Sequence, residues 1–441
     1  MRWVYGIAAL LLFAGSAGGT GVTGRFTTAV YTFERSYPDT VSRGDLRAYQ
    51  TARFRVMGLG RSELSFQAYL RASLDLLHRA GNDPQYRFYH GYFRWEADED
   101  RFVLTGGRQL VLAGVGVGRI DGIRADVDLG GLGRLDAYAG TLVPVDREGV
   151  SGWGEGHMFG VHLMSSRLLE TSLGVSFYRR SRQARPYLSS SRMAAGLGSL
   201  EIQAGEVEQQ MVGSDLQRRL GRLLSLYLRW DLSMPDPLQT RRMEGVLRYS
   251  YQGFTLSGEV LYRKPYVDRN SIFSLFTHSS NREASFRGNY RFNRFLSLFG
   301  EVSKVDYEGD DGYRINLGAN VLNGYVGYIR RRGYGGVADG LTASLRYRMN
   351  RKVWMDGGFH LSRFRLYEGE GARSTVATST LGVTYRPGRR LSLSLQGQNL
   401  MQDLKLATRA NPFPGMSHDL RFFFRATTWF FRGPGPGRGA P

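Results

Sequence analysis

The amino-acid sequence predicts an all-β fold: a transmembrane antiparallel β-barrel of about 20–22 strands, with about 18–24 as the outer range. Three observations support this prediction. Apolar and polar residues alternate along most of the chain, glycine and aromatic residues are abundant, and one short apolar segment stands at the beginning. Together these features indicate two-faced strands in an exported protein.

The alternation has the period of a β-strand, most clearly in four segments. Residues 224–233, 254–263, 341–349 and 391–398 place apolar side chains on one face and mostly polar or charged side chains on the other. Segments of this kind have about 9–12 residues, the length of a tilted strand across a bilayer, whereas globular strands average about 5–6. A soluble solenoid, propeller or sandwich is the alternative. No fixed repeat is visible in the sequence, and these strands are long for a sandwich.

The composition agrees with many strands joined by glycine-containing turns. Glycine (58 residues) and aromatic residues (13%) are frequent, whereas proline (13 residues) is not. The mean hydropathy of −0.32 resembles that of a soluble protein, but only alternate residues of a barrel strand face lipid. The absence of cysteine excludes disulfides, thiolate metal ligands, a cysteine nucleophile and covalently attached haem in this chain.

The formal net charge is +20, and only four of the 59 basic residues are lysines. A basic chain suits nucleic acid, anionic lipid headgroups or an anionic solute. Nucleic-acid binders concentrate their charge in a stripe or tail, whereas the arginines here are spread along the whole chain. We therefore expect the arginines to line a pore and contact headgroups, with no nucleic-acid partner.

Three regions follow from these patterns. Residues 1–19 have a positive start, a short apolar run and small residues, which predicts a cleaved signal peptide. A membrane anchor is the alternative, but the apolar run is about half the roughly 20 residues that a spanning helix needs. Residues 20–431 are the predicted barrel, and residues 432–441 a disordered tail rich in glycine and proline.

The connections between strands differ in length. Barrels of this kind have short periplasmic turns and longer external loops. The predicted periplasmic turns are 293–294, 349–352 and 386–389, and the predicted external loops are 142–155, 181–190, 264–281 and 366–373.

The last strand, Leu420–Phe431, is rich in aromatic residues and alternates. Together with the signal peptide and the alternation elsewhere, it resembles the closing strand of the bacterial outer-membrane porin-like family. The resemblance implies an integral outer-membrane protein whose partners are lipid, lipopolysaccharide and the barrel-assembly machinery. It also implies that the assembly machinery recognises Phe422, Phe424, Phe430 and Phe431. The family usually stops at the terminal phenylalanine, whereas this chain continues to residue 441.

Glycines at 114, 116 and 118 suggest a phosphate-binding loop, but neither the spacing nor a lysine of such a loop is present. The alternative is a flexible or inward-folded loop after a strand near Arg101–Gln109. If this loop enters the barrel, it narrows the pore. The candidate constriction residues are then Arg108, Arg119, Asp121 and Arg124.

The polar faces of other strands supply further candidate pore-lining residues. These are Arg229, Asp231, Arg248, Glu259, Arg263, Glu301, Arg346, Arg348, Arg421 and Arg425. Arginine outnumbers acid among them, which predicts a basic interior that favours anions. The alternative is that part of this set forms structural salt bridges between strands.

The candidates for catalysis are weak. His278-Ser279-Ser280-Asn281 resembles the serine–histidine string of outer-membrane phospholipases, but it lies in a predicted polar loop. His157 and His162 are five residues apart and would face opposite sides of a strand, which is poor for a shared metal. We therefore predict no catalytic residue, no metal site and no cofactor.

The leading hypothesis is a non-enzymatic channel for small hydrophilic solutes that prefers anions. One alternative is a structural sheath around a multihaem cytochrome, as in outer-membrane electron conduits, in which this chain supplies only the barrel. A minor alternative is an outer-membrane phospholipase.

Overall fold

The computed structural model describes residues 21–37, 40–59, 63–78, 84–97, 101–144, 149–168, 171–183, 187–188, 201–202, 206–234, 238–264, 280–307, 310–333, 336–365, 373–404 and 415–432. The signal peptide and the tail beyond Arg432 lie outside these residues, so the predicted domain boundaries stay predictions. In the described part of the chain, no helix is both long and apolar enough to cross a membrane.

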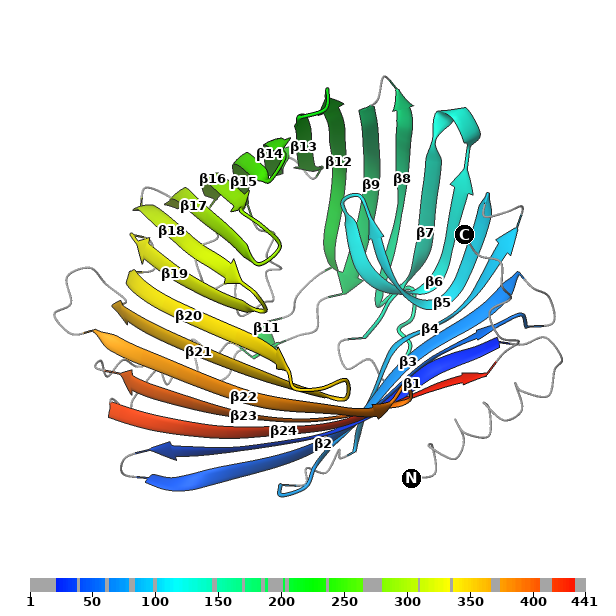
Figure 1. Cartoon of the computed structure of the whole chain (residues 1–441). Coiled ribbons are helices and arrows are strands. Elements are labelled where there is room, and N and C mark those ends of the chain that lie inside the picture. Colours follow the sequence, from blue (N-terminus) through cyan, green and yellow to red (C-terminus); the bar gives the residue numbers. More distant parts are fainter. Residues whose placement is uncertain are drawn as a thin grey trace. The chain divides into compact units, whose positions relative to one another are not determined.

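Twenty-two strands form one sheet (Figure 1). They are β1 (Gly21–Tyr37), β2 (Thr40–Met57), β3 (Leu64–Asp75), β4 (Gln85–Ala97), β5 (Phe102–Ala113), β6 (Gly116–Asp128), β7 (Arg134–Leu142), β8 (Gly156–Leu168), β9 (Thr171–Gln183), β12 (Glu206–Leu220), β13 (Leu224–Ser233), β14 (Gln239–Tyr251), β15 (Phe254–Arg263), β16 (Asn281–Arg291), β17 (Leu296–Tyr307), β18 (Asp310–Val321), β19 (Gly324–Arg332), β20 (Val337–Arg348), β21 (Val353–Arg365), β22 (Ser374–Gly388), β23 (Leu391–Leu404) and β24 (Gly415–Arg432). Two short strands, β10 (Tyr187–Leu188) and β11 (Glu201–Ile202), pair separately, and η1 (Gly130–Leu132) is one 3₁₀ turn.

The sheet closes on itself. Strands that follow one another in the chain pair antiparallel, and β9 pairs with β12 across the segment that contains β10 and β11. The first strand pairs with both β2 and the last strand, β24, over nearly its whole length. A sheet whose first and last strands pair has no free edge, which is the arrangement that a membrane-spanning sheet requires. The prediction of an antiparallel barrel is confirmed, at the upper end of the predicted strand number.

The strands have the two faces that their sequences predict. In β13, Leu228 and Trp230 are 44% and 49% exposed, whereas Asp231 on the opposite face is 5% exposed. Val260 in β15 and Val302 in β17 are likewise exposed on the apolar face. In water, such rows would form an aggregation-prone surface, but in a bilayer they face lipid. The polar face therefore lines the interior of the barrel.

The connections alternate between two ends of the sheet, because the strands are antiparallel. The start of β1 and the end of β24 share one end with the short turns 252–253, 292–295, 322–323 and 349–352. The longer connections after β7, β9, β15 and β21 belong to the other end. The short turns are built by local chemistry: the Asn293 and Asn350 side chains each accept two backbone N–H groups. Because periplasmic turns are the short ones, we assign the first end to the periplasm.

The chain forms two compact units. Unit 1 spans Met1–Phe88, Arg248–Gly258 and Glu283–Pro441, and unit 2 spans Tyr89–Leu247 and Glu259–Arg282. In unit 1, Val22, Phe54, Val56 and Ala68 pack together on the apolar face of β1–β3. In unit 2, the main apolar cluster lies on the polar face of the wall, where the hairpin of β5 and β6 covers it.

Candidate pore constriction

The hairpin of β5 and β6 leaves the barrel wall halfway along its length (Figure 1). β5 pairs with β4 only as far as Arg108, and β6 pairs with β7 only from Ile120 onward. Between these two points the strands continue to pair with each other, up to Ala113 and Gly116. Residues 109–119 therefore form a hairpin whose only strand partner is itself. The sequence predicts a flexible or inward-folded loop at this point. The structure has an ordered hairpin that folds inward.

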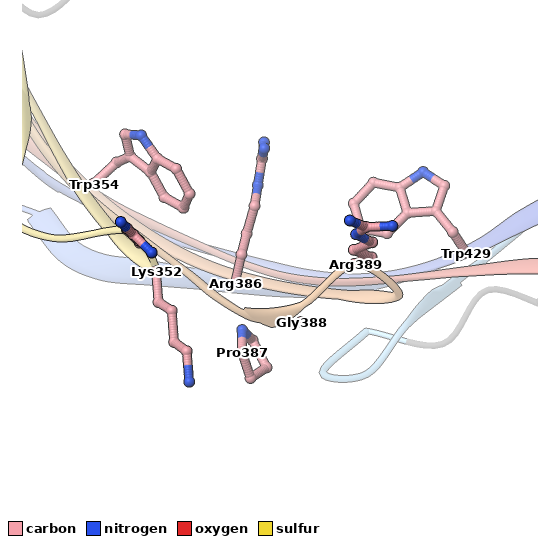
Figure 2. A pocket seen from close by; sticks show the side chains of 8 residues that line it. Lys352, Trp354, Arg386, Pro387, Gly388, Arg389 and Trp429 are labelled. Carbon is pink, nitrogen blue, oxygen red and sulfur yellow. The ribbon is translucent and has the colours of Figure 1, made fainter.

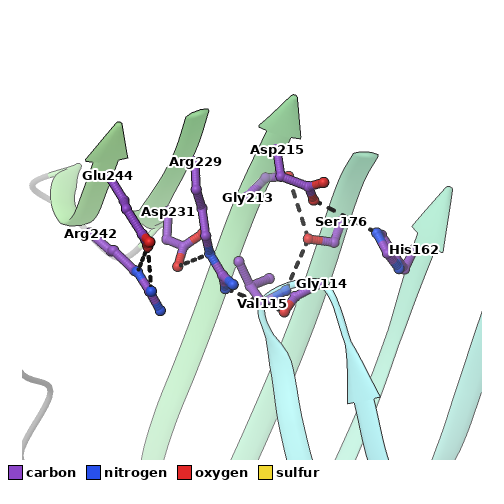
Figure 3. A network of polar contacts seen from close by, with 10 residues as sticks. All are labelled: Gly114, Val115, His162, Ser176, Gly213, Asp215, Arg229, Asp231, Arg242 and Glu244. Carbon is purple, nitrogen blue, oxygen red and sulfur yellow. Dashed lines mark hydrogen bonds and ion pairs between the residues drawn. The ribbon is translucent and has the colours of Figure 1, made fainter. Parts of the chain in front are cut away.

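The tip of this hairpin is bound to the polar face of the wall (Figure 3). The Val115 N–H donates to Ser176 Oγ in β9 at 3.1 Å. The Ser176 hydroxyl in turn donates to the Gly213 carbonyl in β12 at 3.4 Å. Arg229 in β13 donates from Nη2 to the Gly114 carbonyl, also at 3.4 Å. Side chains of β9 and β13 thus bind the backbone of the tip, and β12 holds the Ser176 hydroxyl.

Apolar packing holds one face of the hairpin. Val111 in the hairpin and Ile120 at its base are fully buried, and they cluster with Tyr138, Met158 and Tyr178 from β7, β8 and β9. Burial of apolar side chains of this size stabilises by about 1.5–3 kcal/mol each. The cluster lies on a face that is otherwise polar, which indicates that this part of the wall is built to receive the hairpin.

Glycines permit the close approach. Gly114 has a φ of +57°, a conformation that favours glycine, and it lies against Ser176. A Cβ at Gly116 would overlap the Tyr138 hydroxyl oxygen, and a Cβ at Gly213 would overlap Val115 Cγ1. The glycine run that suggests a phosphate loop in the sequence therefore serves tight packing of the hairpin.

Of the predicted constriction residues, three form ion pairs on the wall beside the hairpin. Arg108 pairs with Asp121 through two bonds, Nε–Oδ1 at 2.7 Å and Nη2–Oδ2 at 2.8 Å, and also donates to the Gly149 carbonyl. Arg124 donates from Nε to Asp136 Oδ1 at 2.9 Å. The fourth candidate, Arg119, lies over the Tyr89 ring at 5.8 Å.

Further ion pairs continue along the same face. Arg229 pairs with Asp231 at 3.0 Å, and Arg242 pairs with Glu244 in β14 (Figure 3). In unit 1, Glu301 accepts from Arg287 at 2.8 Å and from Arg314 at 3.1 Å. Arg421 likewise pairs with Asp419, at 2.9 Å. These residues therefore fit the alternative that part of the predicted lining forms structural salt bridges.

The remaining predicted lining residues are different. Arg248, Arg263, Arg346 and Arg425 are exposed on the polar face and form no ion pair with any described residue, and neither does Glu259. Arg348 donates to the Asn350 carbonyl and lies 5.5 Å from the Trp354 ring centre. Among the predicted lining, the arginines without a counter-ion thus outnumber the acids without one.

Sequence reasoning missed a basic pocket at the periplasmic end of unit 1 (Figure 2). Its volume is about 520 Å³. It is lined by Arg351, Lys352, Trp354, Arg386, Pro387, Gly388, Arg389 and Trp429. In the sequence, the charged members appear only as ordinary turn residues. The concentration of arginine around two predicted turns was the one signal that could have pointed to the pocket.

The described residues do not bring the histidines considered for catalysis or metal binding together. His278 and Ser279 lie outside the described residues, so the phospholipase alternative cannot be built from the structure. His157 stacks on Trp153, whereas His162 lies 4.0 Å from Asp215, so the two histidines have separate surroundings. The prediction of no catalytic residue stays a prediction.

One group of three possible metal ligands occurs among the described residues. Asp45, Asp75 and His78 could each offer one ligand atom, all within 4.8 Å of one another. Asp75 already accepts the backbone N–H groups of Leu77 and His78 and lies 3.5 Å from Arg47. A carboxylate with these partners is a poor metal ligand, and the absence of a metal site stays a prediction.

The predicted assembly residues lie on β24. Phe422 and Phe424 are exposed on the apolar face, and Phe430 stacks on Phe26 of β1 with ring centres 5.3 Å apart. Phe431 is more than half exposed. Their recognition by the assembly machinery stays a prediction, but their strand does close the barrel.

No family model matches this sequence, and no curated protein matches it significantly. Solved structures do. A mutant of the ferric enterobactin receptor PfeA from Pseudomonas aeruginosa aligns with a TM-score of 0.59 at 10% identity, covering 92% of this chain and 80% of the receptor. The siderophore receptor PirA from Acinetobacter baumannii aligns with a TM-score of 0.56 at 9% identity, covering 94% and 81%.

These similarities concern the fold, and the fold defines the class of protein. A closed 22-stranded antiparallel barrel with a lipid-facing apolar surface is an integral barrel of the bacterial outer membrane. The chain therefore has the architecture of outer-membrane barrels such as these two receptors.

Proposed function

We propose that this protein is a passive channel for small hydrophilic solutes that favours anions, with the hairpin 109–119 as its constriction. The observation that carries the proposal is the attachment of this hairpin to the interior face of the wall through Val115, Ser176 and Arg229. A segment that is fixed to the interior face narrows the passage through the barrel without closing it. An inward-folded segment of this kind sets the diameter of the pore. The charges that line the pore set its ion preference.

The charge of the interior supports the anion preference. Where arginine pairs with a carboxylate, as at Arg108–Asp121 and Arg229–Asp231, the two charges cancel at a distance. The arginines without a counter-ion, such as Arg248 and Arg346, leave a positive field in the interior. A positive field raises the local concentration of anions and repels cations.

Conductance of the purified barrel in planar bilayers tests the proposal. We expect single-channel steps, and a reversal potential in a KCl gradient that indicates chloride preference. Absence of any conductance would sink the channel function. Cation preference would overturn only the anion part.

A hairpin variant tests the constriction. Gln109 and Ile120 face each other across the hairpin, so residues 110–119 can be replaced by Asn-Gly, the preferred two-residue turn. We expect a larger conductance from this variant. As a control, Leu322→Asn with Asn323→Gly places the same turn where Leu322 already has a φ of +54°, and its conductance should equal that of the unmodified protein.

Other outcomes favour other functions. A sheath around a multihaem cytochrome would show no conductance and would co-purify with a haem protein. A phospholipase would hydrolyse ester bonds in detergent and lose that activity in Ser280→Ala. Lipopolysaccharide and the barrel-assembly machinery remain the proposed partners for insertion.

A further inference from the structure

The basic pocket at the periplasmic end lacks the counter-charges that the arginines beside the hairpin have. Its four cationic residues are Arg351, Lys352, Arg386 and Arg389, and no carboxylate lines it. None of the four forms an ion pair with a described residue. Elsewhere in the interior, arginines such as Arg108 and Arg124 each have a carboxylate within 3 Å. Four neighbouring cations without an acid repel one another, and an anion would relieve that repulsion.

Two tryptophans give the pocket flat apolar surfaces. The guanidinium group of Arg386 lies 5.0 Å from the Trp354 ring centre, and that of Arg348 lies 5.5 Å from it. These cation–π contacts fix the direction of Arg386 and leave its N–H groups free to donate. In Figure 2, Trp354 and Arg386 rise on the same side of the sheet, and Arg389 lies beside Trp429. Trp429 is partly exposed and lines the pocket, and it forms no ring contact with another described aromatic residue.

A break in the strand register builds the pocket. The pairing of β22 with β23 shifts between Tyr385 and Gly388, where Pro387 supplies no N–H to the ladder. Bulges of this kind turn side chains away from their regular direction. The Arg386 N–H still donates to the Lys352 carbonyl at 2.7 Å, and the Trp429 N–H donates to the Arg390 carbonyl at 2.9 Å. The neighbouring turns are therefore tied to each other, and the cations are held on a fixed frame.

We propose that this pocket is a binding site for a small organic anion that carries a phosphate or carboxylate group on a flat apolar part. The guanidinium groups of Arg386 and Arg389 bind the anionic group, because planar forks match phosphate and carboxylate oxygens. The Trp429 ring contacts the flat part. A volume of about 520 Å³ suits a ligand of this kind, since small-molecule sites measure about 300–1,000 Å³.

This site deepens the proposed channel function and rests on it, because a solute must reach the periplasmic end of the interior. It makes the anion preference specific: simple anions pass, whereas aromatic anions pause at the exit. The shared chemistry of a free solute and a lipid headgroup is the phosphate group. The proposal commits to the free solute, because Trp354 and Trp429 belong to the polar face and not to the lipid-facing one, and Arg386 lies over the Trp354 ring.

The test is equilibrium binding of phenyl phosphate to the whole barrel in an uncharged detergent, followed by calorimetry and tryptophan fluorescence. Inorganic phosphate and benzyl alcohol supply the charge and the ring separately. We expect phenyl phosphate to bind more tightly than either. In Arg386→Gln with Arg389→Gln, loss of charge-assisted bonds should raise the Kd at least about tenfold. In Trp429→Phe, the fluorescence response should fall and the Kd should rise less.

A matched control removes the same charge elsewhere. Arg219→Gln with Arg222→Gln neutralises two exposed arginines at another short turn of the sheet, between β12 and β13, and the Kd should stay unchanged. An equal effect of both double variants, or no binding of phenyl phosphate at millimolar concentration, would overturn the site. Competition by phosphatidylglycerol but not phosphatidylcholine in nanodiscs would assign the pocket to a lipid headgroup and overturn the free solute.

Binding does not require conductance, so the two proposals fail separately. A barrel that binds phenyl phosphate but never conducts would refute the channel and keep the site. A barrel that conducts with anion preference but binds nothing would keep the channel and refute the site.

Discussion

At the scale of single residues, a glycine decides how closely the hairpin approaches the wall. A methyl group at Gly116 would meet the Tyr138 hydroxyl, which is buried and cannot move away freely. We expect Gly116→Ala to destabilise the hairpin by about 1–3 kcal/mol, the usual cost of overpacking a filled core. Single-channel recording should show a higher or noisier conductance.

The control for this variant lies in the part of β5 that pairs with the wall. A Cβ at Gly106 meets nothing within 4 Å, so Gly106→Ala should leave the conductance unchanged. If both alanine variants behave alike, close packing at Gly116 does not hold the hairpin.

The ion pair of Arg108 and Asp121 gives a second prediction at this scale. The Arg108 side chain is 3% exposed and its partner 15%. Asp121→Asn removes the charge that balances a buried guanidinium, which typically costs about 3–5 kcal/mol. Denaturant unfolding in detergent should show this loss of stability.

The matched variant for this pair restores neutrality. Arg108→Gln with Asp121→Asn replaces the ion pair by two amides of similar shape, and most of the lost stability should return. A double variant as unstable as Asp121→Asn would mean that the Arg108 side chain itself, rather than an unbalanced charge, is what the wall requires.

At the scale of elements, the hairpin 109–119 allows the sharpest test. The chain has no cysteine, so within the chain two introduced cysteines can react only with each other. A Cβ at Gly213 lies next to the Val115 side chain, within reach of a disulfide. Val115→Cys with Gly213→Cys should therefore form a disulfide in mild oxidant, seen as a mobility shift without reductant. The oxidised channel should conduct like the reduced one, because the bond holds the hairpin where it already lies.

Two results would contradict this picture. A disulfide that forms but abolishes conductance would mean that the hairpin leaves the wall when the channel opens. Failure of the two cysteines to react, while Val115→Cys alone reacts with a soluble thiol reagent, would mean that the tip is not held at Gly213.

The same scale shows what the sequence can and cannot predict. The limits of β13 and β15 agree with the predicted segments 224–233 and 254–263, because period-two alternation is a local property of the strand. The docking of Gly114 and Val115 onto Ser176 and Gly213 joins segments far apart in the chain, and no local pattern encodes which wall strands receive the tip. Even so, the glycine run pointed to the right segment.

The basic pocket was missed for a related reason. Its residues come from two turns and the closing strand, and a register shift after Tyr385 brings them together. A bulge changes which side chains share a face, so the alternation that predicts the strands fails at the point where the pocket forms. In the sequence, Trp429 appears only as one aromatic residue of the last strand, Leu420–Phe431.

At the scale of the whole molecule, the net charge of +20 does not by itself set the ion preference. The electric field of a paired arginine is largely cancelled by its carboxylate partner. An exposed arginine without a counter-ion contributes a full charge to the interior. We therefore expect Arg248→Gln, Arg263→Gln, Arg346→Gln and Arg425→Gln, combined in one variant, to reduce chloride preference strongly. The reversal potential in a KCl gradient should move toward zero.

The control keeps the number of substitutions and removes no net charge. Combining Arg421→Gln with Asp419→Asn and Arg124→Gln with Asp136→Asn neutralises two ion pairs, and the reversal potential should stay where it is. High salt offers an independent check, because at about 1 M the Debye length falls to about 3 Å and the field of unpaired arginines is screened. Chloride preference should then decline in the unmodified protein, and it should decline less in the fourfold variant. Selectivity that persists unchanged at high salt would instead point to the narrow passage beside the hairpin as its source.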